Sequence, residues 1–179
     1  MKATGIVRRI DDLGRVVIPK EIRRTMRIRE GDPLEIYTDR DGEVIFKKYS
    51  PMGELGTVVG GLAEALSRTA GMSCAICDRD AVIAAAGGAK KEIYEKAISA
   101  DLEMLMEQRH IYEHNGSDEV VHVSANDPYR VVVAAPIIAE GDVTGCVAFL
   151  ADSGEEHATE VEAKLSQTAA NFLSRHVTM

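Results

Sequence analysis

One stretch of twelve residues, from Leu13 to Arg24, constrains the fold of this chain more than any other part of its sequence. It reads LGRVVIPKEIRR: a glycine suited to a turn, four residues suited to a β-strand, a proline, and a charged segment. Proline is well tolerated at the first position of a helix, because the amide that it lacks would have no partner there. The stretch therefore predicts a strand over residues 15–18 and one turn of helix that begins at Pro19.

The three arginines of this stretch are expected to be held in place rather than scattered over the surface. Side chains alternate between the two faces of a strand, so Val16 and Ile18 can be buried together while Arg15 lies on the opposite face. Arg23 and Arg24 end the predicted helical turn. Arginines fixed on a turn and a helix end can bind phosphates and the edges of bases. The stretch therefore indicates nucleic-acid binding.

Residues 1–50 resemble the swapped-hairpin DNA-binding domain of the AbrB family of transition-state regulators. The resemblance is carried by the stretch just described, by TGIVR at 4–8 before it and by LEIY at 34–37 after it. It implies an all-β head in which two chains exchange hairpins and form a small dimeric barrel that binds double-stranded DNA.

The rest of the chain resembles the α+β GAF domain that some regulators of this family carry behind the head. We therefore expect an AbrB-like DNA-binding domain over residues 1–50 and a GAF-like sensory and oligomerisation domain over residues 51–179. The resemblance implies a transcription regulator of sporulation genes that acts as activator and repressor. It also implies a homotetramer, built from dimers of the head.

The distribution of charge agrees with this division. The net charge of the whole chain is −8, which by itself argues against nucleic-acid binding. Residues 1–50 contain twelve Lys or Arg and nine Asp or Glu, a net charge of +3, whereas residues 51–179 contain nine and twenty, a net charge of −11. A basic head on an acidic body is typical of a DNA-binding module with a separate partner domain.

Composition limits the other classes of function. The chain has no Trp and only 4% aromatic residues, so binding of single strands by base stacking is not expected. No apolar run approaches the roughly 20 residues that span a bilayer. The first residues lack the apolar core of a signal peptide. We expect a cytoplasmic, nucleoid-associated protein with no membrane segment.

The head is expected to contain four strands. Residues 4–10 and 15–18 form one pair around a turn at 11–14, and residues 34–38 and 43–48 form another around the turn signal DRDG at 39–42. Fifty residues bury little core, and domains of this size are marginal as monomers. A dimer would close the strand edges of each chain with the other.

Ser50 and Pro51 mark the boundary between the domains, as the N-cap and first residue of a helix. That helix carries apolar residues at heptad-like spacing. They are Leu55, Val59, Leu62, Leu66 and Ala70. We expect Leu55, Leu62 and Leu66 on this helix, and Val161, Leu165 and Phe172 on the last one, to join GAF-like domains into a tetramer.

The remaining pattern predicts alternating strands and helices. A hairpin is expected over 74–77 and 81–86, one helix over 90–108, and strands over 120–123, 130–138 and 143–150. A capping-box sequence at 153–156 is expected to open a last helix that runs to about His176. This order is typical of an α+β domain.

The DNA-binding residues that we expect are five arginines of the head. They are Arg8, Arg9, Arg15, Arg23 and Arg24. Guanidinium keeps its charge at physiological pH and binds guanine or phosphate with two hydrogen bonds. The alternative is that these are surface arginines paired with Asp11, Asp12 and Glu21. The predicted helix is too short to fill a major groove, so selectivity should depend on DNA shape more than on a base code.

No metal or catalytic site is expected. Cys74 and Cys77 form a CxxC, but Cys146 is the one other cysteine, and positions i and i+3 of a strand face opposite sides. They are interpreted as buried structural thiols. His110 and His114 have helical metal spacing but follow the end of the helical pattern. The segment GGAKK at 87–91 lacks the spacing of a phosphate loop and is interpreted as the entrance to a helix.

The sequence is compatible with three functions: a DNA-binding regulator, an antitoxin, and a reductase. Antitoxins share the swapped-hairpin head but usually end in a disordered segment. Some GAF domains reduce free methionine sulfoxide with cysteines in their pocket. We expect a regulator that is not an enzyme. The segment 110–127 is expected to cover a GAF pocket, whose ligand, if there is one, is unidentified.

Overall fold

The structure is a computed structural model that describes residues 4–116, 119–151 and 157–177. The chain forms two compact units, Met1–Tyr49 and Ser50–Met179. They are described separately below, as the head and the second unit.

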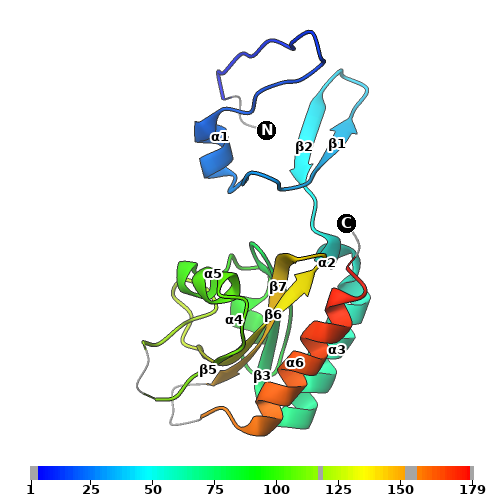
Figure 1. Cartoon of the computed structure of the whole chain (residues 1–179). Helices are drawn as coiled ribbons and strands as arrows, with labels where there is room; N and C mark the ends of the chain where they lie inside the picture. The colour runs from blue at the N-terminus through cyan, green and yellow to red at the C-terminus, as the bar shows by residue number, and fades with distance from the viewer. Residues whose placement is uncertain (1–3, 117–118, 152–156, 178–179) are drawn as a thin grey trace. The chain divides into compact units, whose positions relative to one another are not determined.

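The described residues of the head form one helix and one hairpin (Figure 1). Helix α1 is Lys20–Thr25, and the antiparallel strands β1, Leu34–Thr38, and β2, Val44–Lys48, pair so that Ile36 lies opposite Phe46. The hairpin turns at residues 39–43, where Gly42 has a φ of 80°. This hairpin and its turn confirm the prediction from the sequence.

The predicted strands over 4–10 and 15–18 are wrong for a single chain. These segments are not in strands in the structure, although the turn between them is present. Within one chain they lack a neighbouring strand, so the described part of the head does not close into a barrel. Val16 is 43% exposed rather than buried with Ile18. Pro19 is the N-cap of α1 instead of its first residue.

The second unit begins with a capped helix, as predicted. Ser50 accepts a hydrogen bond from the amide of Gly53 at 3.2 Å, and Pro51 is the first residue of α2, Pro51–Glu54. Leu55 interrupts the helix, and α3 continues over Gly56–Ala70. The predicted single helix is therefore two helices.

One antiparallel sheet of five strands forms the centre of the second unit, in the order β4-β3-β7-β6-β5. The strands are β3 Ser73–Asp78, β4 Val82–Ala86, β5 Tyr112–Glu113, β6 Arg130–Ala139 and β7 Asp142–Ala151. The hairpins β3–β4 and β6–β7 confirm the sequence predictions. Residues 120–123 do not form a strand, and His122 alone among them forms an isolated bridge. Strand β5 was not predicted.

The two faces of the sheet have separate cores. Helices α3 and α6, Glu160–Ser174, cover one face and pack on the core that contains Cys74 and Phe149 (Figure 1). The other core contains Cys77 and is covered by α4, Lys90–Ile93, by α5, Ala100–Glu107, and by the segment that follows. Cys74 and Cys77 thus face opposite sides, as the alternation along a strand requires.

The helix predicted over 90–108 is wrong between Tyr94 and Ser99. The backbone there pairs with β4. The amide of Val82 donates to the carbonyl of Lys96 at 2.9 Å, and the amide of Glu95 donates to the carbonyl of Val82 at 3.0 Å. Ser99 then caps α5 by accepting from the amide of Leu102 at 3.0 Å. Tertiary hydrogen bonds have replaced the helical ones over this segment.

The last helix begins later than predicted. Thr159 is the N-cap of α6 and forms a capping box with Glu162, and the helix ends at Ser174. Burial of Glu162 raises its pKa, but hydrogen bonds from Thr159 outweigh that effect and hold the pKa below its ordinary value. The capping-box sequence predicted at 153–156 lies outside the described residues.

Gly145 is required by the close approach of β7 to β3. A Cβ atom at this position would overlap the carbonyl oxygen of Cys77 and lie 3.2 Å from the Cα of Asp78. Both are backbone atoms in the middle of the sheet, which cannot move without breaking strand pairing. By contrast, a Cβ atom at Gly61 in α3 would meet nothing within 4 Å apart from its chain neighbours and the backbone of its own helix.

We predict that Gly145→Ala destabilises the chain by about 3 kcal/mol or more, because the added methyl group overpacks the sheet. Gly61→Ala should instead stabilise it by about 0.5–1 kcal/mol, because alanine favours a helix interior. Urea unfolding of the full chain, followed by circular dichroism, measures both. Equal stability of Gly145→Ala and wild type would contradict the strand spacing described here.

Candidate nucleic-acid interface

The five arginines singled out from the sequence lie on three consecutive segments of the head. Arg8 and Arg9 precede the turn at 11–14, Arg15 follows it, and Arg23 and Arg24 lie in the last turn of α1. All five are exposed. The carbonyl end of a helix favours cations, so the placement of the last two on α1 is electrostatically favourable. The head thus presents cationic side chains from a turn and from a helix end.

Of these arginines, Arg15 is paired with a carboxylate. Its Nε donates to Oδ2 of Asp11 at 2.8 Å, and 69% of its side chain remains exposed. In the described part of the chain, Arg9, Arg23 and Arg24 form no ion pair. The alternative of paired surface arginines therefore applies to Arg15 and Asp11 alone.

Asp11 is held by the turn as well as by the arginine. Its Oδ1 accepts from the amides of Leu13 at 3.0 Å and Arg15 at 2.8 Å. The hydrogen bond from the Arg15 amide, followed by that from the Arg15 guanidinium, lowers the pKa of Asp11 below its ordinary value of 3.8. Asp11 is thus a carboxylate throughout the physiological range of pH, and both of its oxygens accept hydrogen bonds from the turn.

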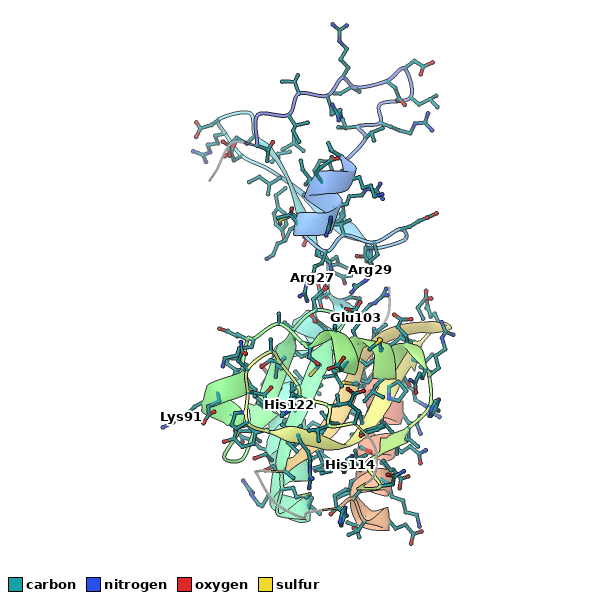
Figure 2. The ribbon with its side chains drawn as sticks, turned by 90° about the vertical axis from the view of Figure 1, so that its left-hand side faces the viewer. Arg27, Arg29, Lys91, Glu103, His114 and His122 are labelled. Atoms are coloured by element: carbon teal, nitrogen blue, oxygen red, sulfur yellow. The ribbon has the colours of Figure 1, made fainter. Side chains whose placement is uncertain are left out.

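Other cations of the head have structural contacts that the sequence did not indicate. Lys48 donates to the carbonyl of Arg27 at 2.8 Å and lies 3.6 Å from the carboxylate of Asp32. It therefore ties the segment between α1 and β1, where Figure 2 labels Arg27 and Arg29, to the hairpin. A charge count alone cannot separate such a cation from one that is available to a ligand.

The three cysteines are buried and face the interior. Cys77 on β3 lies opposite Cys146 on β7, and both belong to one core, whereas Cys74 belongs to the other. Burial, and the neighbouring Cys146 to a smaller extent, raise the pKa of Cys74 to about 12. A hydrogen bond with Cys146 and burial raise the pKa of Cys77 well above its ordinary value. These are protonated structural thiols, as expected.

The two histidines with helical metal spacing do not share a site. His110 is exposed, whereas His114 is 5% exposed, and its Nδ1 lies 3.1 Å from the hydroxyl of Tyr112. No group of three His, Cys, Asp or Glu that could hold a metal ion occurs among the described residues. Gly87, with a φ of 86°, precedes α4, so the segment at 87–91 is the entrance to a helix as interpreted.

Residues 119–129 cover the second face of the sheet and include most of the described part of the segment 110–127, where a GAF pocket is expected. Figure 2 labels His114 and His122 on it. Asp127 is 6% exposed and organises the segment, because it accepts from the amide of Ser124 at 2.6 Å and from that of Tyr129 at 2.8 Å. Apolar side chains fill the space beneath. They include Ile93, Leu102, Met106, Val123 and Tyr129.

Comparisons with known proteins agree with the division into two units. Residues 54–178 match the family model "Stage V sporulation protein T C-terminal, transcription factor". Residues 7–53 match the model "Antidote-toxin recognition MazE, bacterial antitoxin". In the part of the chain that the structure describes, no helix has the length and apolar character needed to cross a membrane.

Two relatives from Bacillus subtilis (strain 168) are similar to the chain. Stage V sporulation protein T is 53% identical over 178 residues, which cover 99% of both chains. Transition state regulatory protein AbrB is 65% identical over 51 residues, 28% of this chain and 52% of that protein. The second similarity confirms the AbrB-type head that the sequence predicts.

A solved structure confirms the predicted fold of the second unit. The GAF domain from Acinetobacter phosphoenolpyruvate-protein phosphotransferase is 11% identical, with a TM-score of 0.56 over 73% of this chain and 84% of that one. At this identity the similarity concerns the fold alone.

We predict that the native chain resists thiol alkylation. Raising the pKa of Cys74 from 9.0 to about 12 lowers its thiolate fraction near pH 8 by about 1,000-fold. Mass spectrometry after iodoacetamide treatment should show unlabelled native chain, and three labelled cysteines once guanidinium has unfolded it. Rapid labelling of a native cysteine would contradict the structural role and would favour the reductase alternative.

Proposed function

This chain belongs to the stage V sporulation protein T family of transcription factors and is a regulator of sporulation genes. We propose that its two units have the following roles. Residues 1–50 form a dimeric head that binds double-stranded DNA through arginines. Residues 51–179 join dimers into a tetramer and respond to a small molecule through the GAF-like fold. The chain acts on the nucleoid, as activator and repressor, and is not an enzyme.

The dimer is supported by the lack of an interior in the head. Among residues 4–49, Pro19 alone is buried. Twelve large apolar side chains of the head are exposed. They are Ile6, Val7, Ile10, Leu13, Val16, Val17, Met26, Ile36, Tyr37, Val44, Ile45 and Phe46. Burying one such side chain stabilises a fold by about 1.5–3 kcal/mol, so a second copy that covers them supplies the missing core.

An exchange of hairpins explains why this second copy is another head. The segments 4–10 and 15–18 have strand-forming sequences but no strand beside them within one chain. Strands of a partner can complete them, which also closes the exposed edges of the hairpin β1–β2. The dimer then has a two-fold axis, and each of the five arginines occurs twice.

The arginines are proposed to bind the DNA backbone and the groove edges. Arg8, Arg9, Arg15, Arg23 and Arg24 form this set. Helix α1 has six residues, too few to fill a major groove as a recognition helix does. Selectivity for promoters therefore depends mainly on the shape and deformability of the duplex. The exposure of all five arginines on one small unit is the observation that carries the DNA-binding role.

The tetramer is proposed to form through α3 and α6, with residues that differ in part from those expected. Leu66 is buried in the unit's own core, and Leu55, Leu62 and Leu165 pack against it. Val58 on α3 and Val161 and Phe172 on α6 remain 43–54% exposed. These three are the apolar side chains that a second GAF-like domain can cover. The heptad-like stripes themselves serve mainly to hold the helices on the sheet.

An antitoxin role is not favoured, although residues 7–53 match an antitoxin model. The chain after residue 53 folds into an α+β unit with two cores rather than an extended toxin-binding tail. A reductase role is not favoured either, because Cys74, Cys77 and Cys146 are buried.

We predict that Arg15→Ala makes DNA binding less dependent on salt. If Arg8, Arg15, Arg23 and Arg24 of both chains each neutralise one phosphate, the slope of log affinity against log salt is about −7. Losing two contacts per dimer should make the slope shallower by nearly 2. If Arg15 contacts a base instead, the slope should hold while selectivity falls by about 1–3 kcal/mol per contact.

The measurement is a salt titration of the full chain on a target promoter and a scrambled duplex. Arg68→Ala, an exposed arginine of α3, is the matched control and should leave both quantities unchanged. If Arg15→Ala also left slope and selectivity unchanged, Arg15 would have no part in DNA binding.

We predict that Phe172→Glu converts the tetramer into dimers, because it places a charge in the proposed contact between GAF-like domains. Sedimentation of the full chain at micromolar concentration measures the mass. Met104→Glu is the control, since Met104 is 59% exposed on α5, which covers the other face of the sheet. A tetramer that survives Phe172→Glu, or that is lost equally in Met104→Glu, would rule out this interface.

A further inference from the structure

The head contains two turns with the same backbone hydrogen bonds, at residues 11–15 and 39–43. In the first, the amide of Asp11 donates to the carbonyl of Arg15 at 3.0 Å, and that of Gly14 donates to the carbonyl of Asp11 at 3.0 Å. In the second, the corresponding distances are 3.2 Å and 3.4 Å. The fourth residue of each is a glycine, with φ of 76° and 80°, a conformation that favours glycine.

The aspartate that opens each turn also plays the same part. Oδ1 of Asp39 accepts from the amides of Asp41 and Glu43, both at 3.0 Å. Oδ1 of Asp11 accepts from the corresponding amides, those of Leu13 and Arg15. One carboxylate oxygen is therefore sufficient to close a turn of this kind.

The turns differ in their fifth residue, which is Arg15 in one and Glu43 in the other. Of these two side chains, only the arginine can donate to the second carboxylate oxygen, and Oδ2 of Asp11 accepts from Nε of Arg15 at 2.8 Å. We propose that Asp11 is a positioning residue for DNA recognition: its Oδ2 fixes the guanidinium of Arg15 before DNA binds. This inference rests on the proposed DNA contact of Arg15.

The geometry suits such a role. A guanidinium has five N–H donors, and the Nε contact uses one of them, so the four on the terminal nitrogens remain for phosphate or for guanine. Fixing the side chain in the free protein reduces the ordering that binding must otherwise impose on it. A fixed guanidinium also has one orientation, which is what discriminates between duplexes of different shape.

A carboxylate beside DNA also opposes binding through its charge, in contrast to the positioning effect. Its charge repels every phosphate backbone, whatever the sequence, so removing the charge strengthens binding to any duplex. Loss of positioning weakens binding to the target specifically. A positioning role and a purely electrostatic role therefore predict different changes in selectivity, the ratio of target to scrambled affinity.

The experiment compares Asp11→Asn with Asp39→Asn in the full chain. Asparagine keeps the Oδ1 acceptor that closes each turn, and its amide nitrogen cannot accept from Nε of Arg15. The affinities for the target promoter and for the scrambled duplex are measured for each variant and for Arg15→Ala. Nitrogen-15 NMR of arginine Nε–H groups reports directly whether the Nε–H of Arg15 remains hydrogen-bonded.

We expect Asp11→Asn to lower selectivity by about 2- to 10-fold for each of the two turns in a dimer, without weakening binding to the scrambled duplex. The slowly exchanging Nε–H signal of Arg15 should be lost. Asp39→Asn should change neither the selectivity nor the Nε–H signal of Arg15. Unchanged selectivity in Asp11→Asn, or an equal loss in Asp39→Asn, would overturn the positioning role while leaving the DNA contact of Arg15 intact. If Arg15→Ala changed neither affinity nor selectivity, the proposed DNA contact of Arg15 would itself be ruled out.

Discussion

The described head has almost no interior of its own, and this constraint bears on both its fold and its proposed function. Of its described residues, Pro19 alone is buried, while twelve large apolar side chains are exposed. Local hydrogen bonds close its two turns, but a turn cannot supply the free energy of a core. In the proposed dimer, the fold of this unit is therefore a property of two chains together. The proposed dimer also doubles the set of arginines, so that one assembly would supply both the core of the head and the proposed DNA contacts.

The second unit, unlike the head, has a large core, because its sheet buries apolar residues on both faces. Cys74 and Cys77 show the alternation directly, since each belongs to a different core. One face carries α3 and α6, and Val58 on α3 and Phe172 on α6 remain exposed. The other carries α4, α5 and the segment organised by Asp127. The proposed association and the proposed sensing would thus use different faces of one sheet.

The sequence predicted the features that local chemistry decides. Ser50 caps a helix, the hairpins turn where glycine and aspartate occur, and the AbrB-type pattern identified the head. It did not predict features that depend on distant partners. Residues 94–99 look helical by period, yet their backbone bonds to Val82. Residues 4–10 look like a strand, but no strand pairs with them within the same chain. The pairing of Asp11 with Arg15 was weighed as an alternative, but its turn geometry could not be read from spacing.

Hydrogen exchange of the full chain tests most directly whether a second chain completes the head. Among the described residues, the amides of Val7–Ile10 and Val16–Ile18 have no hydrogen-bond partner within one chain. If strands of a partner pair with these segments, their amides should be protected, and protection should increase with protein concentration. Exchange of these amides at the rate of an unfolded chain, at every concentration, would contradict the account.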